Sequence, residues 1–176
     1  MRFYVFFGFI VMFLLGCDKV DSLTQFDMNY EESIVVPAST GINLPFDLFT
    51  PDMETDSESE FAVNNTKKNL IEEIVLKKLG LIITAPENGD FSFLKSIEIY
   101  ISAEDLQEIK IAWNENIPEN AGRELELETS DNDLKEYIKK DSYKLRLHTV
   151  TDKVLASDYH IDVRSVFRVD AKILGI

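Results

Sequence analysis

The chain is poor in the side chains that most often bind metals or form cross-links. Cys17 is the only cysteine among 176 residues, and His148 and His160 are the only histidines. A single cysteine excludes an intramolecular disulfide and the cysteine-rich zinc sites, because each of these needs at least one further thiolate. Seven glycines and five prolines also exclude a collagen-like or low-complexity chain.

Basic residues are also scarce. The sequence holds 18 Lys and Arg against 32 Asp and Glu, for a net charge of −14. Such a chain is repelled by nucleic acid and by anionic lipid headgroups, so we expect no nucleic-acid partner. The apolar share of 45% and the twelve phenylalanines indicate a folded body rather than intrinsic disorder.

The sequence has no apolar run long enough to span a bilayer. The longest is 3–15, thirteen uncharged residues that follow Arg2 and would form a helix of about 20 Å, short of the roughly 30 Å hydrocarbon core. This length is typical of the apolar region of a secretory signal peptide. The run ends in Leu14-Leu15-Gly16-Cys17, and a polar segment, 18–24, follows.

That tetrad resembles the lipobox of bacterial lipoproteins. The resemblance implies that residues 1–16 are a signal peptide, that cleavage falls between Gly16 and Cys17, and that the Cys17 thiol carries a diacylglycerol. Residues 17–24 would then be a lipidated tether, and 25–176 one domain. At about 0.8 kcal/mol per buried methylene, two or three acyl chains hold a protein on a membrane almost permanently. The alternatives are an ordinary secretory signal with a chance cysteine, or a buried N-terminal strand, which the absence of an amphipathic period disfavours.

The resemblance also implies a location in the bacterial cell envelope, outside the cytoplasm. We expect the outer membrane, although Asp18 resembles an inner-membrane retention signal of enteric bacteria. Removing residues 1–16 takes away one cation, Arg2, which leaves 17 basic against 32 acidic residues and a net charge of −15.

From residue 25 onward, apolar and polar residues alternate in many short segments. Alternation of period two marks strands with one buried face. Turn signals separate these segments at 37–41, 86–89 and 118–122. The pattern predicts a mainly β domain: one two-sheet β-sandwich, immunoglobulin-like or jelly-roll, with one or two short helices. The segments start near residues 26, 34, 44, 79, 97, 109, 125, 143 and 159.

Several local features of this pattern can be stated as separate expectations. A helix is predicted over 130–140, capped by Ser130 and Asp133, and a second over about 56–68. Segment 70–78 fits a helix or a strand; we favour a strand running on to Thr84, with a bulge at Gly80. Segments 96–102 and 107–113 are predicted to pair as a hairpin, with Ile99, Ile111 and Trp113 in the core.

The histidines provide one candidate metal site. If strands 142–150 and 159–169 pair as a hairpin, His148 lies opposite His160, and Arg146 lies opposite Asp162. Two imidazoles at that separation could share a zinc ion with Asp158 or Asp162. The alternative, which we favour, is two solvated histidines near the end of a hairpin.

Alternating carboxylates provide a second candidate. Asp52, Glu54, Asp56, Glu58 and Glu60 recur at every second position, so an extended loop would project them to one side, where calcium could neutralise them. We favour a solvated acidic loop leading into a helix. Asp131 and Asp133 suggest a metal pair in the same superficial way, and helix capping explains Asp133 without one.

Two short motifs suggest covalent modification. Asn64-Asn65-Thr66 matches an N-glycosylation sequon, and Ser22 lies in a triplet that resembles an O-glycosylation signal of some bacterial envelopes. The alternative reading of each motif is a polar loop.

No sequence motif points to catalysis or to a cofactor. The chain has no HExxH, P-loop, GxGxxG or GxSxG pattern. We therefore expect no enzyme and no cofactor, but a membrane-anchored lipoprotein with a non-catalytic binding or structural role toward an envelope protein or a glycan. One alternative is a carrier of a lipid or other hydrophobic ligand, in a slot lined by Ile99, Ile111, Trp113 and Phe167. The other is a metal-dependent enzyme that uses His148 and His160.

Overall fold

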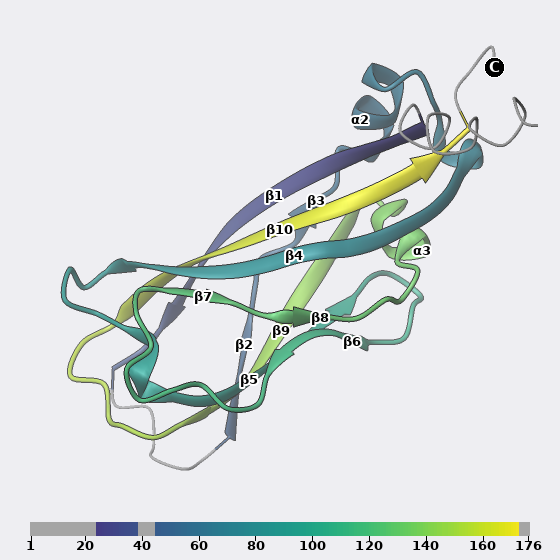
Figure 1. The fold of residues 1–176 in the computed structure, drawn as a ribbon. Helices are drawn as coiled ribbons and strands as arrows, with labels where there is room; N and C mark the ends of the chain where they lie inside the picture. The colour runs from purple at the N-terminus through teal and green to yellow at the C-terminus, as the bar shows by residue number, and fades with distance from the viewer. Residues whose placement is uncertain (1–23, 39–44, 173–176) are drawn as a thin grey trace, which may run out of the picture.

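The computed structural model describes residues 24–38 and 45–172 as two β-sheets packed face to face, with short helices at one end (Figure 1). None of the helices in these two ranges is long and apolar enough to cross a bilayer. The elements are β1 (Gln25–Val36), β2 (Pro45–Phe49), β3 (Met53–Glu54), α2 (Ser57–Val63), the 3-10 turn η2 (Lys68–Leu70), β4 (Ile71–Ala85), η3 (Phe91–Phe93), β5 (Leu94–Ser102), β6 (Ile109–Asn114), β7 (Glu124–Glu126), β8 (Glu128–Thr129), α3 (Lys135–Ile138), β9 (Ser142–Thr151) and β10 (Tyr159–Ala171).

The two sheets are antiparallel, and the chain passes repeatedly from one to the other. One sheet has the order β1-β10-β4-β7, and the other has the order β2-β9-β5-β6-β8, with β3 attached to β9. This arrangement is that of a jelly roll, in which each sheet combines strands from the first and the last parts of the chain. The predicted two-sheet sandwich is confirmed, and of the two predicted types it is the jelly roll.

The core lies between the two sheets and follows the predicted alternation. Ile99, Leu145 and Phe167 are fully buried, as expected for the inward positions of β5, β9 and β10. Tyr143 packs edge-on against Phe167, with ring centroids 6.0 Å apart, and against Tyr30 at 5.8 Å. Such edge-to-face pairs add to the free energy gained by burying the rings.

Two polar atoms in this core have no hydrogen-bond partner among the described residues: the Tyr143 hydroxyl and Ser165 Oγ. Burial raises the pKa of Tyr143, and the nearby Ser165 hydroxyl only partly offsets that rise. The two oxygens therefore interact electrostatically, but their geometry is not that of a hydrogen bond.

The strand predicted over 70–78 is confirmed as the first half of β4, but the predicted position of the bulge is wrong. Gly80 pairs regularly with Arg164 on one side and Glu126 on the other. The register against β10 instead shifts at three other places, at Thr84, at Glu72 and, in the middle of the strand, at Lys77. Its exposed side chain reaches Asp27, with 3.0 Å between Nζ and Oδ2. This central bulge therefore falls at a charged residue that stays in solvent.

Of the two predicted helices, one is confirmed and the other is much shorter than expected. Helix α2 lies within the predicted 56–68, whereas α3 covers only four residues of the predicted 130–140. Asp133 Oδ1 accepts hydrogen bonds from the backbone N–H of Ile74 and of Lys135, both at 3.1 Å. The segment before Lys135 is thus bound to the edge of β4 and cannot continue the helix backward.

Both helices lie at the end of the sandwich where β1 begins and β10 ends (Figure 1). Phe26 in β1 contacts Phe61 in α2 edge-on, with centroids 6.4 Å apart. Thr66 Oγ1 donates to the Lys172 carbonyl at 2.7 Å. The chain therefore enters the sandwich at Gln25, beside α2.

The connection from β4 to β5 is closely packed around Gly89. A Cβ on Gly89 would lie 3.0 Å from the Pro86 carbonyl oxygen, 3.0 Å from the Tyr159 ring and 3.1 Å from Ile83. A side chain at this position would press on backbone as well as on the core, so its neighbours would have to move by a few tenths of an ångström.

Candidate binding face

The outer face of the six-stranded sheet carries two rows of aromatic and charged side chains that run across the strands. Strand register places each member directly beside the next, because neighbouring strands lie about 4.8 Å apart. The aromatic–cation row consists of Phe49, Arg146, Tyr100 and Lys110. The carboxylate row consists of Asp47, His148, Glu98, Trp113 and Glu128.

Trp113 reaches this face because of a bulge, and its predicted place in the core is wrong. The hairpin of β5 and β6 is confirmed, but Ile99 pairs with Ala112 and Tyr100 pairs with Lys110, which leaves Ile111 as an extra residue. Ile111 and Ala112 are both fully buried, so the alternation reverses after them. Trp113 therefore lies beside Glu98 on the outer face, half-buried.

In the aromatic–cation row, Arg146 is the best connected residue. Its Nε donates to both carboxylate oxygens of Glu108 at 3.1 and 3.0 Å, and its Nη1 donates to Asp47 at 2.9 Å. The guanidinium carbon lies 4.2 Å from the centroid of the Tyr100 ring, a cation–π contact. Only 20% of the Arg146 side chain is exposed.

The two rows are linked through Glu98. Its Oε2 accepts the Tyr100 hydroxyl at 2.7 Å, and its Oε1 accepts Lys110 Nζ at 3.0 Å. Lys110 Nζ also lies 5.3 Å from the centre of the Trp113 ring. At the far edge, Trp113 Nε1 donates to Glu128 Oε2 at 3.1 Å. The side chains thus position one another across the sheet.

Asp47 provides a second link between the two rows, because it bonds both His148 in its own row and Arg146 in the other. The distance from His148 Nδ1 to Asp47 Oδ1 is 2.8 Å, and the same oxygen also accepts Arg146 Nη1. The hydrogen bonds from His148 and Arg146 hold the pKa of Asp47 below its usual range. The Tyr100 hydroxyl and Lys110 do the same to the pKa of Glu98. Both carboxylates are therefore fully ionised at neutral pH and act as hydrogen-bond acceptors.

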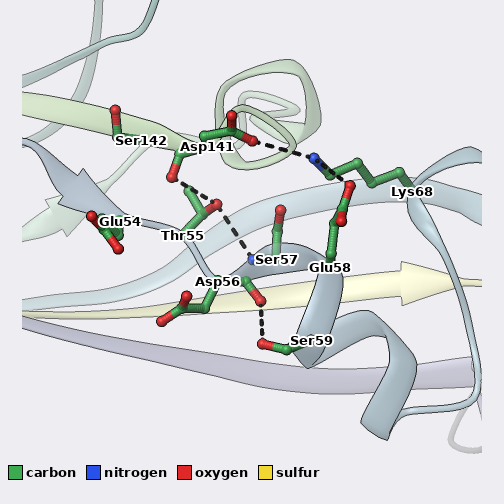
Figure 2. Close-up of a pocket in the computed structure, with 9 residues that line it drawn as sticks. All are labelled: Glu54, Thr55, Asp56, Ser57, Glu58, Ser59, Lys68, Asp141 and Ser142. Carbon is green, nitrogen blue, oxygen red and sulfur yellow. Dashed lines mark hydrogen bonds and ion pairs between the residues drawn. The ribbon is translucent and has the colours of Figure 1, made fainter.

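A surface hollow of about 460 Å³ lies where β3 and the start of α2 meet the loop before β9. Figure 2 shows the Lys68 ammonium between the carboxylates of Glu58 and Asp141, at 3.3 and 3.7 Å, with Glu54 and Asp56 turned away from it. The hollow is lined by Glu54, Thr55, Asp56, Ser57, Glu58, Ser59, Lys68, Asp141 and Ser142.

The alternating carboxylates do not converge as a calcium site requires. Asp52 pairs with Lys144 at 3.3 Å, and Glu58 pairs with Lys68. The chain leaves the extended conformation at Asp56, whose backbone is left-handed (φ 45°), before α2 begins. Within residues 24–38 and 45–172, no three His, Cys, Asp or Glu side chains are grouped so as to hold a metal ion.

The predicted hairpin of 142–150 with 159–169 is wrong. Strand β9 pairs with β2 and β5, whereas β10 pairs with β1 and β4 in the other sheet. His148 therefore lies beside Glu98, and His160 lies between Val35 and Ala85 on the opposite side of the sandwich. Buried residues alternate identically in both arrangements, so the pattern alone could not distinguish them.

Because β9 and β10 lie in different sheets, the predicted ion pair between Arg146 and Asp162 does not form. Arg146 bonds Asp47 and Glu108, and Asp162 accepts the Ser33 hydroxyl at 2.7 Å. The shared zinc site predicted for the two histidines, with Asp158 or Asp162, thereby loses its geometric basis.

The remaining sequence candidates lie in the helical end or outside the described residues. Asn64 ends α2, and its Nδ2 donates to the Glu60 carbonyl at 2.8 Å. Thr66, the third residue of that sequon, is buried with its hydroxyl bonded to Lys172. Both sequon side chains are thus engaged within the fold. Cys17 and Ser22 lie outside the described residues.

The predicted hydrophobic slot does not form as expected. Ile99, Ile111 and Phe167 are all fully buried, and Trp113 lies on the other side of the sheet. The three buried residues are part of the packed core.

Comparison with known proteins identifies no family. No protein-family model matches the chain, and no curated protein matches it. Among solved structures, a chain of Desmodium yellow mottle tymovirus is 14% identical, with a TM-score of 0.28 over 86% of this chain and 91% of that one. A chain of turnip yellow mosaic virus is 11% identical, with a TM-score of 0.26 over 86% and 98%. Likenesses this distant carry no argument about function.

Proposed function

We propose that this chain is a lipid-anchored, non-catalytic binding protein of the bacterial cell envelope, and that the outer face of its six-stranded sheet binds its partner. One observation carries the proposal: the two rows of aromatic and charged side chains. Aromatic and Arg side chains are the residue types enriched at binding surfaces. Here Arg146, Tyr100 and Trp113 are positioned by hydrogen bonds and yet remain partly exposed.

The electrostatics of the face support binding rather than proton transfer. A general acid or base works best when its pKa lies near the operating pH. Hydrogen bonds from His148 and Arg146 instead lower the pKa of Asp47, and those from Tyr100 and Lys110 lower the pKa of Glu98. The hydrogen bond to Glu98 raises the pKa of Lys110, and those to Glu108 and Asp47 raise the pKa of Arg146. All four groups therefore keep one charge state at neutral pH, as suits a fixed recognition surface.

The anchor rests on the lipobox resemblance at Leu14–Cys17. The eight residues 17–24 span at most about 28 Å when extended, so lipid at Cys17 would keep the domain close to the membrane. The chain enters the sandwich beside α2, the end that carries the acidic hollow. That end would be repelled by anionic headgroups, which leaves the flat outer face accessible from the side.

The anchor and the face are tested separately. For the anchor, the native protein and a Cys17→Ser variant are fractionated and weighed by mass spectrometry. We expect the native N-terminal peptide to begin at Cys17 with its lipid mass and to fractionate with membrane, and the variant to be released. An unmodified Cys17 in the native protein would refute the anchor.

For the face, a photo-crosslinking amino acid replaces Phe49 in living cells. Phe49 is 62% exposed on the outer face, and Val35, 44% exposed on the other sheet, is the matched control position. We expect a crosslinked partner from position 49 and none from position 35. Equal yields from both positions would refute the assignment of the face.

A further inference from the structure

We propose that the ligand of this outer face is an oligosaccharide that is neutral or carries amino groups. This inference rests on the proposed binding function and adds the chemical class of the ligand. Its basis is the composition, the spacing and the charge of the two rows.

The composition of the face matches a ligand with many hydroxyl groups. Protein interfaces usually have an apolar centre, and among the described residues Phe49 is the only large apolar side chain of this face that is strongly exposed. Asp47, Glu98 and Glu128 can each accept up to four hydrogen bonds, more than their present partners supply. Neighbouring hydroxyls of a sugar are donors suited to such carboxylates, and the C–H face of a sugar ring can pack on the exposed Phe49 ring.

The spacing of the aromatic side chains suits several linked sugars rather than one. Phe49 and Tyr100 lie two strands apart in one row, about 9.6 Å. Tyr100 and Trp113 are diagonal neighbours on adjacent strands, about 7–8 Å apart. The three aromatic side chains are therefore spread over more of the sheet than one monosaccharide covers, with Arg146 over the Tyr100 ring and Lys110 over the Trp113 ring.

The charge of the face selects among glycans. Around the two permanent cations, Arg146 and Lys110, stand the four carboxylates of Asp47, Glu98, Glu108 and Glu128. The whole chain is also strongly acidic, with a net charge of −14. A uronate or phosphate polymer would be repelled by both, whereas neutral or amine-bearing sugars would not.

The test uses Trp113, the only tryptophan of the chain, as a reporter on the face. The native protein, kept in a sugar-free detergent, is first screened on a glycan array that holds neutral, amine-bearing and acidic oligosaccharides. The strongest binder is then titrated by Trp113 fluorescence and by calorimetry. We expect saturable binding of a neutral or amine-bearing oligosaccharide of at least three sugars.

Two exposed apolar residues provide the variants. Phe49→Ala on the face should weaken binding at least fivefold, and Val63→Ala, 79% exposed in α2, should leave it unchanged. Both retain the Trp113 reporter. Trp113→Phe, followed by calorimetry, should also weaken binding. Equal affinities for all variants would overturn the assignment to this face.

The failure of this inference can be told apart from failure of the proposed function. Absence of any array signal, or a preference for acidic glycans, would overturn the oligosaccharide inference. A protein crosslinked from position 49 in cells would then leave the binding function standing, with a protein as the ligand.

Discussion

Replacing Arg146 by alanine tests whether the outer face is held together as described. The substitution removes two hydrogen-bonded ion pairs, with Glu108 and with Asp47, and the cation–π contact on Tyr100. Partly exposed pairs contribute about 0.5–1 kcal/mol each, and an exposed cation–π contact about as much. We therefore expect a loss of about 1.5–3 kcal/mol in the free energy of unfolding.

The assay is urea denaturation followed by Trp113 fluorescence and circular dichroism. Urea is uncharged, so it leaves the ion pairs unscreened. For a domain of this size the loss corresponds to a decrease of about 3–12 °C in Tm. Arg146→Lys keeps the charge but loses the planar fork, and should give about half the loss. In 1 M NaCl, the difference in the free energy of unfolding between Arg146→Ala and the native protein should become smaller, because salt screens the ion pairs.

Arg164 is the matched control on the other sheet. Among the described residues its ion-pair partner is Glu31, at 3.0 Å, and both side chains are 51% exposed. Arg164→Ala should therefore cost less than about 1 kcal/mol. Equal losses for Arg146→Ala and Arg164→Ala, or a loss below about 0.5 kcal/mol for Arg146→Ala, would refute the described network.

Three further predictions concern pH and packing. The pKa values of Asp47 and Glu98 are lower in the folded chain than their ordinary 3.8 and 4.5. The contribution of these two ionised carboxylates to the free energy of unfolding is thus complete above about pH 5, and it is lost as the pH falls through their pKa values in the folded chain. Urea midpoints that stay flat down to pH 2 would contradict this. Tyr143→Phe and Ser165→Ala remove unpartnered buried oxygens and should be neutral or stabilising by about 1–2 kcal/mol, whereas a clear loss in thermal melts would indicate a missed hydrogen bond. Gly89→Ala should destabilise by about 1–3 kcal/mol, and Gly122→Ala, with nothing within 4 Å of the added methyl, should not.

Alternation in the sequence was enough to predict the sandwich, most of its strands and much of its core. It was not enough to predict which strands pair. His148 and His160 show why: the same inward Leu147 and Ile161 result whether β9 and β10 are neighbours in one sheet or face each other across the core. Only the order of all the strands, set by long-range packing, decides between these arrangements.

The candidate face was missed for related reasons. The charged and aromatic residues between the inward positions of β5 and β9 were visible in the sequence as a polar side. Their arrangement into rows depends on cross-strand register, and Trp113 joined them only through the bulge at Ile111. A single extra residue reverses the side on which every later residue of a strand lies, and local sequence does not reveal it.

The claim that this face binds an envelope partner is tested most directly by hydroxyl-radical footprinting of intact cells and of the purified protein. The account predicts that Phe49 and Trp113 are oxidised several times more slowly in cells, while Val63, on α2, is oxidised at the same rate in both. Equal oxidation of Phe49 and Trp113 in cells and in purified protein would contradict it, because an uncovered face binds nothing.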